Sequence, residues 1–224
     1  MRTLFLAVLG LAAPAARADI VYDQDLPAGA TPPAFAISDP SRSQIAADDF
    51  ALTAAATVTD VRWYGRTGVT AIDPVGPATF RIEFLSDGFG PIPLPGSVVS
   101  SQTVDVGRTD VGTTAPLYAY AAALPTPVAL APGRYWLSIA EVDADTPNVW
   151  SWAIASQKPG EFLDVRRDDT AAWTLTDGAA AFTLEGTTTP VDVPAPPAIL
   201  LAGIGAAGFW GVRRRAQPVA ERRV

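Results

Sequence analysis

The chain has 224 residues, with 23 acidic and 16 basic side chains, and it contains neither cysteine nor histidine. Lack of histidine excludes a Ser-His-Asp triad and an imidazole zinc site, and lack of cysteine excludes disulfides and thiol nucleophiles. Residues 19–190 contain 21 acidic and 9 basic residues, a net charge of −12. Such an acidic body repels phosphates and disfavours nucleic acid as a partner.

The first 18 residues have the order of a secretory signal peptide. Arg2 supplies the positive start, Leu4 to Leu11 form the apolar segment, and Ala16 and Ala18 are the small residues of a cleavage site. We therefore expect cleavage after Ala18 and export of the chain that begins at Asp19.

The body of the chain, residues 19–185, alternates apolar and polar side chains in short segments. The residues expected to face inward are Val61, Trp63, Phe80, Ile82, Phe84, Val104, Val106, Tyr135, Leu137, Ile139, Trp150, Trp152, Ile154, Phe182 and Leu184. The turn signals between segments are Asp73-Pro74, Asp87-Gly88, Pro95-Gly96, Pro132-Gly133 and Asp177-Gly178. A period of two is typical of strands with one buried face. We expect about nine or ten short strands in an all-β fold, an antiparallel β-sandwich or jelly-roll-like domain.

Two proline-rich stretches flank these strands. Residues 19–42 are expected to be mostly loop, with a short edge strand at Ile20 to Tyr22. Residues 186–192 are rich in threonine and proline, a composition that favours an extended spacer.

The last 32 residues, 193–224, contain three segments in a fixed order. The segment Val193-Pro194-Ala195-Pro196-Pro197 is followed by the apolar stretch Ala198 to Val212 and then by Arg213-Arg214-Arg215. As a helix, the apolar stretch would be roughly 22 Å long at ~1.5 Å per residue, which is short for a hydrocarbon core of ~30 Å. The arginines favour the cytoplasmic side, which agrees with an exported body. A plain single-pass tail anchor is the alternative.

These residues resemble the PEP-CTERM sorting signal of exopolysaccharide-producing Gram-negative bacteria. Val193, Pro194 and Pro196 match the motif, and Arg213, Arg214 and Arg215 match its basic stop. Ala195 stands where the family usually has glutamate. The resemblance implies transient anchoring in the inner membrane by a transmembrane helix at 198–212. It also implies cutting near the motif by an exosortase-type transpeptidase, followed by release to the cell surface or the extracellular matrix.

A second resemblance covers the body of the chain. The phrases that carry it are Ala47-Asp48-Asp49-Phe50, Val61-Arg62-Trp63-Tyr64-Gly65, Phe80-Arg81-Ile82-Glu83-Phe84, Pro95-Gly96, Ala131-Pro132-Gly133-Arg134-Tyr135-Trp136-Leu137-Ser138-Ile139 and Ala181-Phe182-Thr183-Leu184-Glu185-Gly186. In this order they are similar to a group of secreted bacterial β-sandwich domains that end in varied anchors. The resemblance implies a fold and a surface setting, and it implies no catalytic residues.

Acidic clusters are the first candidates for chemistry. A glycosidase needs two carboxylates facing each other across a cleft, whereas neighbours in a strand such as Asp48 and Asp49 point to opposite faces. Asp143 and Asp145 are candidate calcium ligands, because calcium prefers hard oxygen atoms. The favoured interpretation of Asp48-Asp49, of Asp168-Asp169 and of Asp143 with Asp145 is ordinary solvated loop carboxylates, or, for Asp48, the cap of a turn near a strand start.

Aromatic residues are the second group. Trp63, Trp150 and Trp152 share parity with aliphatic neighbours and are expected in the core. Tyr64 and Trp136 have the opposite parity and are the candidates for an exposed carbohydrate-binding surface, since flat rings stack on sugars.

Three functions therefore stand as hypotheses. The favoured one is a non-enzymatic cell-surface or matrix protein without a cofactor other than the candidate calcium. The second is a carbohydrate-binding module for exopolysaccharide, acting through Tyr64 and Trp136. The third is a glycan hydrolase, which requires two carboxylates on one concave surface.

Overall fold

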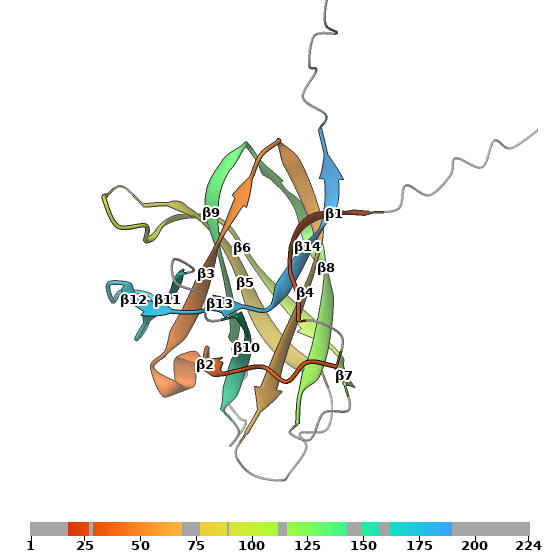
Figure 1. The fold of residues 1–224 in the computed structure, drawn as a ribbon, viewed down its shortest axis with the longest axis vertical. Coiled ribbons are helices and arrows are strands. Elements are labelled where there is room, and N and C mark those ends of the chain that lie inside the picture. The colour runs from red at the N-terminus through yellow and green to blue at the C-terminus, as the bar shows by residue number, and fades with distance from the viewer. Residues whose placement is uncertain are drawn as a thin grey trace, which may run out of the picture. The chain divides into compact units, whose positions relative to one another are not determined.

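The structure is a computed structural model that describes residues 18–26, 29–68, 77–88, 90–111, 116–142, 149–156 and 162–189. Within these ranges every strand pair is antiparallel, and the strands form two sheets that pack face to face (Figure 1). The prediction of an all-β antiparallel fold is confirmed.

Sheet 1 is built around one long central strand. Its members are β1 (Asp19–Gln24), β2 (Phe35–Ile37), β4 (Ala56–Thr67), β7 (Arg108–Asp110), β8 (Tyr118–Leu130), β10 (Trp150–Ser156), β13 (Ala179–Ala180) and β14 (Phe182–Thr188). One edge of β4 pairs with β8, and the other pairs first with β14 and then with β10. β1 adds outside β14, β2 pairs with the outer edge of β10, and β13 pairs with the last residues of β10.

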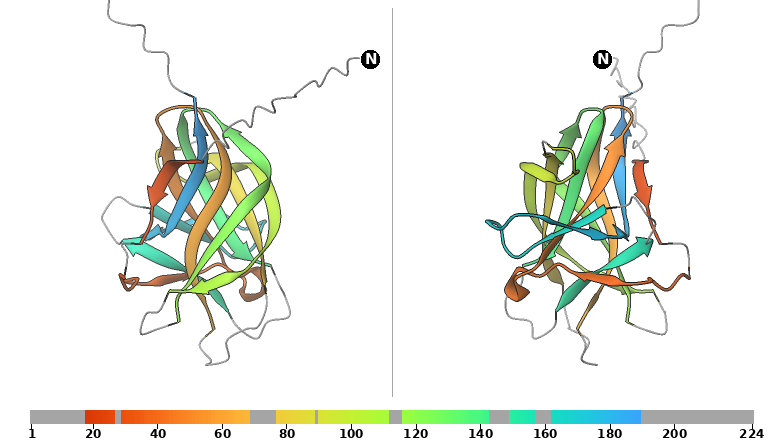
Figure 2. Two further views of the ribbon diagram at one scale, coloured as in Figure 1. Left: turned by 90° about the vertical axis from the view of Figure 1, so that its right-hand side faces the viewer. Right: turned by 60° about the vertical axis from the view of Figure 1, so that its left-hand side comes forward.

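Sheet 2 has a simple linear order. It runs β12 (Thr174–Asp177), β11 (Phe162–Arg166), β3 (Ile45–Leu52), β9 (Gly133–Glu141), β5 (Ala78–Asp87) and β6 (Pro95–Val106). A single 3-10 turn, η1 (Pro40–Arg42), precedes β3. The β11–β12 hairpin lies to one side of the two layers, next to β3 (Figure 2).

Aromatic rings from both sheets form the core. Phe80 of sheet 2 packs edge-on against Trp63 and Trp150 of sheet 1, with ring centres 5.2 and 5.1 Å apart. Further along, Phe50 of sheet 2 packs against Phe182 of sheet 1 at 6.2 Å. Large aromatic side chains bury more apolar area than aliphatic ones, so these contacts carry much of the packing energy in a chain without disulfides.

The two sheets are joined along the β6–β8 side by one side chain. The β4–β8 register leaves residues 124–127 of β8 opposite Thr59 alone, and prolines at 125 and 127 lack the N–H that a ladder requires. The backbone of Thr126, which lies between these prolines, forms its hydrogen bonds to sheet 2 instead. Its N–H donates to Gln102 Oε1 (2.9 Å), and its carbonyl accepts from Gln102 Nε2 (2.8 Å).

Buried polar groups join the sheets near β1 and β13. Asp48 of β3 is almost completely buried, and its Oδ2 accepts from Ala180 N–H (2.7 Å) and from the side-chain amide of Gln24 (2.5 Å). The Ser38 hydroxyl donates to the carbonyl of Ile139 (2.6 Å) and accepts from Ala46 N–H (3.0 Å). A carboxylate with this many partners is a tie between strands, and the expectation of a solvated loop residue at Asp48 is wrong.

The alternation of the sequence locates most of the inward faces correctly. All the residues expected inside are buried except Tyr135, which is half-buried. The predicted edge strand at Ile20 to Tyr22 is part of β1. Two expectations are corrected. The Pro95-Gly96 pair forms the first two residues of β6, directly after the connection from β5, instead of lying within the turn, and β14 includes the first residues of the predicted spacer, 186–188.

Among the described residues, no helix is long and apolar enough to cross a membrane. Residues 1–17 of the predicted signal peptide, 1–18, and the predicted transmembrane helix, 198–212, lie outside the described residues.

We predict that Gly186→Ala lowers the free energy of unfolding by about 1–3 kcal/mol, the usual cost of forcing extra volume into a packed site. A Cβ at this position would clash with the carbonyl oxygen of Thr57 in β4. The control is Gly107→Ala, because a Cβ there meets no atom within 4 Å. Urea denaturation followed by tryptophan fluorescence measures both variants. Equal stability of the two variants would contradict the close contact.

Candidate functional site

A groove separates the edge of sheet 1 from the β11–β12 hairpin of sheet 2. It consists of two cavities of about 530 and 370 Å³ that share Gln44 and Val165 in their walls. The larger cavity is lined by Ser43, Gln44, Val165, Arg166, Arg167, Ala171, Ala172 and Thr174. The smaller one is lined by Ala34, Phe35, Ala36, Ile37, Gln44, Ile154, Leu163, Val165 and Thr176. We call the first the polar end and the second the apolar end.

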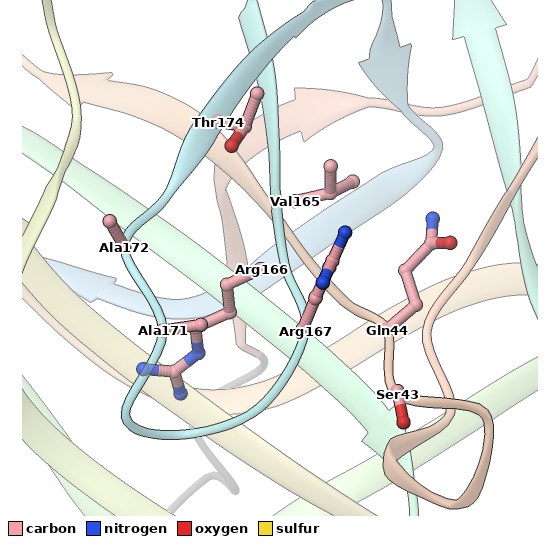
Figure 3. A pocket seen from close by; sticks show the side chains of 8 residues that line it. All are labelled: Ser43, Gln44, Val165, Arg166, Arg167, Ala171, Ala172 and Thr174. Atoms are coloured by element: carbon pink, nitrogen blue, oxygen red, sulfur yellow. The ribbon is translucent and has the colours of Figure 1, made fainter.

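The polar end contains one cationic side chain, Arg167, that has no partner among the described residues. Figure 3 shows the Arg167 side chain between Val165 and Gln44, while the Arg166 side chain points away from it. Arg167 is exposed and has no ion pair or hydrogen bond to a residue that the structure describes. None of the described residues lining this end is acidic. The hydroxyls of Ser43 and Thr174 and the amide of Gln44 are the other polar groups there, so this end suits a negatively charged or hydrogen-bonding ligand.

The local turn before β3 places Ser43 and Gln44 at the groove. Asp39 caps η1 by accepting a hydrogen bond from Ser41 N–H (2.8 Å), and Asp39 also forms an isolated bridge with Gln44. Ser43 ends the turn in the left-handed conformation with φ of 53°, the one positive φ found for a non-glycine residue in the described ranges. Such a conformation is uncommon for serine and needs surrounding contacts to hold it.

The loop between β11 and β12 positions Arg167 from the other side. This loop, residues 167–173, is called the covering loop. Asp169 in the loop accepts two hydrogen bonds of 2.8 Å from the Arg81 guanidinium of β5 and one of 2.7 Å from Arg166. The bonds from Arg81 lower the pKa of Asp169 below its ordinary value. Trp173 stacks on the Arg166 guanidinium at 4.5 Å, which fixes the loop on the outer face of sheet 2.

The covering loop overturns one sequence expectation. Trp136 of β9 does lie on the outer face of sheet 2, as its parity indicates, but it is completely buried. It packs with Ala47, Leu85 and Trp173, because the loop covers this face. Trp136 therefore has no free face to stack on a sugar, and the expectation that it is exposed is wrong.

Tyr64, the other carbohydrate candidate, is half-buried on β4 and is not near Trp136. It packs against the small cluster of Leu26, Leu117, Ala153 and Ala181, and its hydroxyl lies 3.5 Å from Asp25 Oδ2. Burial, together with the nearby Asp25 carboxylate, raises the pKa of Tyr64. The two residues thus do not form a common platform.

Asp49 and Asp164 lie near each other on the outer face of sheet 2. Asp49 follows Ala47 by two residues, and Asp164 of β11 is paired with Ala47, so Asp49 and Asp164 are diagonal neighbours. Asp164 is fully buried and neither of its oxygens has a hydrogen-bond partner among the described residues. Burial, and secondarily the charge of Asp49, raises the pKa of Asp164 to about 7. Asp48, one residue before Asp49, points to the opposite face, as expected, and burial also raises its pKa well above the ordinary value.

Asp168 and Asp169 lie in the covering loop. Asp168 accepts hydrogen bonds from Thr170 N–H (2.8 Å), Thr170 Oγ1 (2.6 Å) and Ala171 N–H (3.0 Å). These bonds lower its pKa. Asp168 is therefore an exposed loop carboxylate, as the sequence analysis expects, and it also caps the turn that follows it.

Several predicted sites cannot be placed. The candidate calcium ligands Asp143 and Asp145, the cleavage-site residue Ala16 and the sorting residues Val193, Pro194, Pro196, Arg213, Arg214 and Arg215 lie outside the described residues. Ala18, the other cleavage-site residue, directly precedes β1. In the described ranges, no group of three or more acidic side chains gathers as a metal site would require.

No protein-family model, curated protein or solved structure matches this chain.

Sequence reasoning did not single out the groove. Ser43, Gln44 and Arg167 have no motif, and only the fold brings the turn before β3 next to the end of β11. The one available signal was that Arg167 is among the few basic residues of an acidic body.

Trp136→Ala is expected to lower the free energy of unfolding by about 3–5 kcal/mol, because it leaves a cavity under the covering loop. Trp136→Phe is the milder control. Urea denaturation gives both values. A truncation that costs less than about 1 kcal/mol would show that the loop does not pack on this face.

The raised pKa of Asp164 predicts that the free energy of unfolding falls as the pH rises. Its folded pKa of about 7 exceeds the ordinary value of about 3.9, so the folded protein keeps a proton that the unfolded chain releases. The stability from this group is complete below about pH 4 and is lost as pH rises to about 7, with a slope of up to about 1.4 kcal/mol per pH unit. Asp48 contributes in the same direction.

We therefore expect Asp164→Asn to flatten the stability profile between pH 5 and 7, measured by urea denaturation at each pH. Asp168→Asn is the control, because a carboxylate with a lowered pKa stays ionised throughout this window. An unchanged slope in Asp164→Asn would show that Asp164 is ionised in the folded protein.

Proposed function

We propose that the chain is an exported, non-enzymatic β-sandwich protein of the cell surface or extracellular matrix, sorted by its PEP-CTERM-like C-terminus. In this proposal residues 1–18 are removed on export. The segment 193–224 anchors the chain in the inner membrane of a Gram-negative bacterium until an exosortase-type enzyme cuts near Val193.

The position of the folded domain between the two predicted signals carries this proposal. β1 begins at Asp19, the residue that follows the predicted cleavage site, and β14 ends at Thr188, shortly before the Val193 motif. The two sheets therefore occupy the part of the chain between the two predicted signals. Removal of both ends would leave every strand of the described domain intact.

The physical properties of the tail support the sorting role over a permanent anchor. A helix of roughly 22 Å is short for a hydrocarbon core of ~30 Å, which favours a temporary hold. The glycines at 203, 205, 208 and 211 give it a smooth face on which another membrane helix packs closely. Such a face suits contact with a membrane-embedded processing enzyme.

The two alternative functions have less support. Carbohydrate binding through Trp136 loses its main residue, since that side chain is buried under the covering loop. For a glycan hydrolase, Asp49 and Asp164 share a face and Asp164 has a raised pKa, as an acid–base pair requires. Asp164 is, however, fully buried, so no substrate reaches it in this conformation. We therefore favour a non-catalytic surface role.

The proposal predicts the two ends of the mature protein. Intact-mass spectrometry of the protein from its native host is expected to give an N-terminus at Asp19 and a C-terminus near Pro194. A variant with Arg213, Arg214 and Arg215 changed to alanine is expected to stay unprocessed at the C-terminus, because its helix loses the cytoplasmic stop. A wild-type mass that extends to Val224 would contradict sorting and leave a plain anchor.

A further inference from the structure

We propose that the groove binds an extended peptide segment of another protein as an added strand on β2, with a carboxylate of that segment held by Arg167. This inference depends on the described domain alone and stands whether or not the chain is sorted as proposed above.

The backbone of β2 has a free edge at the groove. β2 pairs with β10 and with no other described strand. The carbonyl of Ala34 accepts from Ile154 N–H (3.0 Å), and Ser38 N–H donates to the carbonyl of Trp150 (3.3 Å). Because hydrogen-bonded positions alternate along an antiparallel pair, Phe35 and Ile37 direct their N–H and C=O groups away from β10. Both residues line the apolar end, so an incoming strand finds unpaired backbone groups there.

The side chains of the apolar end suit the alternate residues of such a strand. Leu163, Val165 and Ile154 form apolar walls from the two sheets. A strand that pairs with β2 would direct every second side chain toward these walls, which gives selectivity for apolar residues at alternate positions. Its length is limited by the groove, since β2 itself has three residues.

Charge complementarity selects a segment with one acidic group. Arg167 is the exposed cation of the polar end and has no described partner, in a domain whose sequence carries a net charge of −12. Gln44 lies beside it with a further hydrogen-bond donor, and Thr174 lines the same cavity beyond Val165 (Figure 3). A guanidinium binds a carboxylate in a two-pronged geometry, so one Asp, Glu or C-terminal carboxylate would fix the register of the added strand.

A glycan fits the groove less well than a peptide. Sugar rings are usually bound on open aromatic faces, and Phe35 alone is aromatic among the described residues that line the groove. The Arg66 guanidinium covers that ring, with its central carbon 4.0 Å from the ring centre. The free strand edge, by contrast, offers hydrogen bonds that a peptide backbone satisfies and a sugar does not match in spacing.

The test is a selection of random heptapeptides, displayed with free C-termini, on the full-length chain purified in a mild detergent. The expected result is a set of peptides with alternating apolar residues and one carboxylate at a fixed position. Arg167→Gln is expected to weaken binding of the best synthetic peptide by about tenfold, as loss of a charge-assisted hydrogen bond implies. Arg62→Gln is the matched control, because it removes the same charge on β4, outside the groove lining, and is expected to bind normally.

Backbone pairing has its own test, which needs no change to the protein. Two versions of the selected peptide carry N-methyl groups on alternate amides, in opposite phase. One version blocks the amides that face β2 and is expected to lose binding, while the other blocks the outward amides and is expected to retain it.

The proposal is overturned by any of three results. The first is a selection that yields no peptide above a detergent-only control. The second is equal loss of binding in the two N-methylated versions or in the two arginine variants. The third is saturable binding of an acidic oligosaccharide such as oligogalacturonate that depends on Arg167 while no peptide binds, which would assign the groove to an acidic glycan.

Discussion

The ring-to-ring packing between the sheets is the interaction on which the rest of the structure depends. Phe80 reaches across to Trp63 and Trp150, and Phe50 reaches across to Phe182, so aromatic side chains set how closely the layers approach. The chain has no disulfide to share this task. The strand ladders run within each sheet, so the large rings at both ends of the core hold the two sheets together. The contacts at the edges of the sheets can therefore differ from one side of the domain to the other.

That periphery is asymmetric, and the asymmetry creates the groove. On one side Gln102 joins β6 to Thr126 of β8 with two hydrogen bonds, which closes the gap between the sheets. Elsewhere Asp48 ties β3 to Ala180 and to Gln24 of β1. Ser38, directly after β2, also joins the sheets, but no hydrogen bond joins β2 itself to β11 among the described residues, and the groove opens between them. A binding site at this position needs no catalytic group, only an uncovered strand edge and a free cation.

The alternation of the sequence predicts the core because burial on one sheet face repeats every two residues, as at Phe80, Ile82 and Phe84. It does not reveal β8, whose alanines and prolines weaken the pattern, although the strand is among the longest. It also predicts the correct sheet face for Trp136 but wrongly predicts that the side chain is exposed. Trp173, which is remote in sequence, packs over Trp136. The burial of Asp48 and the proximity of Gln44 to Arg167 likewise depend on contacts between segments that are distant in sequence. Local pattern carries no information about such pairings.

One feature of sheet 1 bears on the order in which the molecule assembles. The first strand, β1, pairs along its length with the last one, β14, and β14 in turn pairs with β4. In a chain that emerges N-terminus first, β1 therefore stays unpaired until β14, at the end of the domain, has also emerged. The pairing of β1 with β14 closes a loop of nearly the whole domain, so its entropic cost makes this contact one of the last to form.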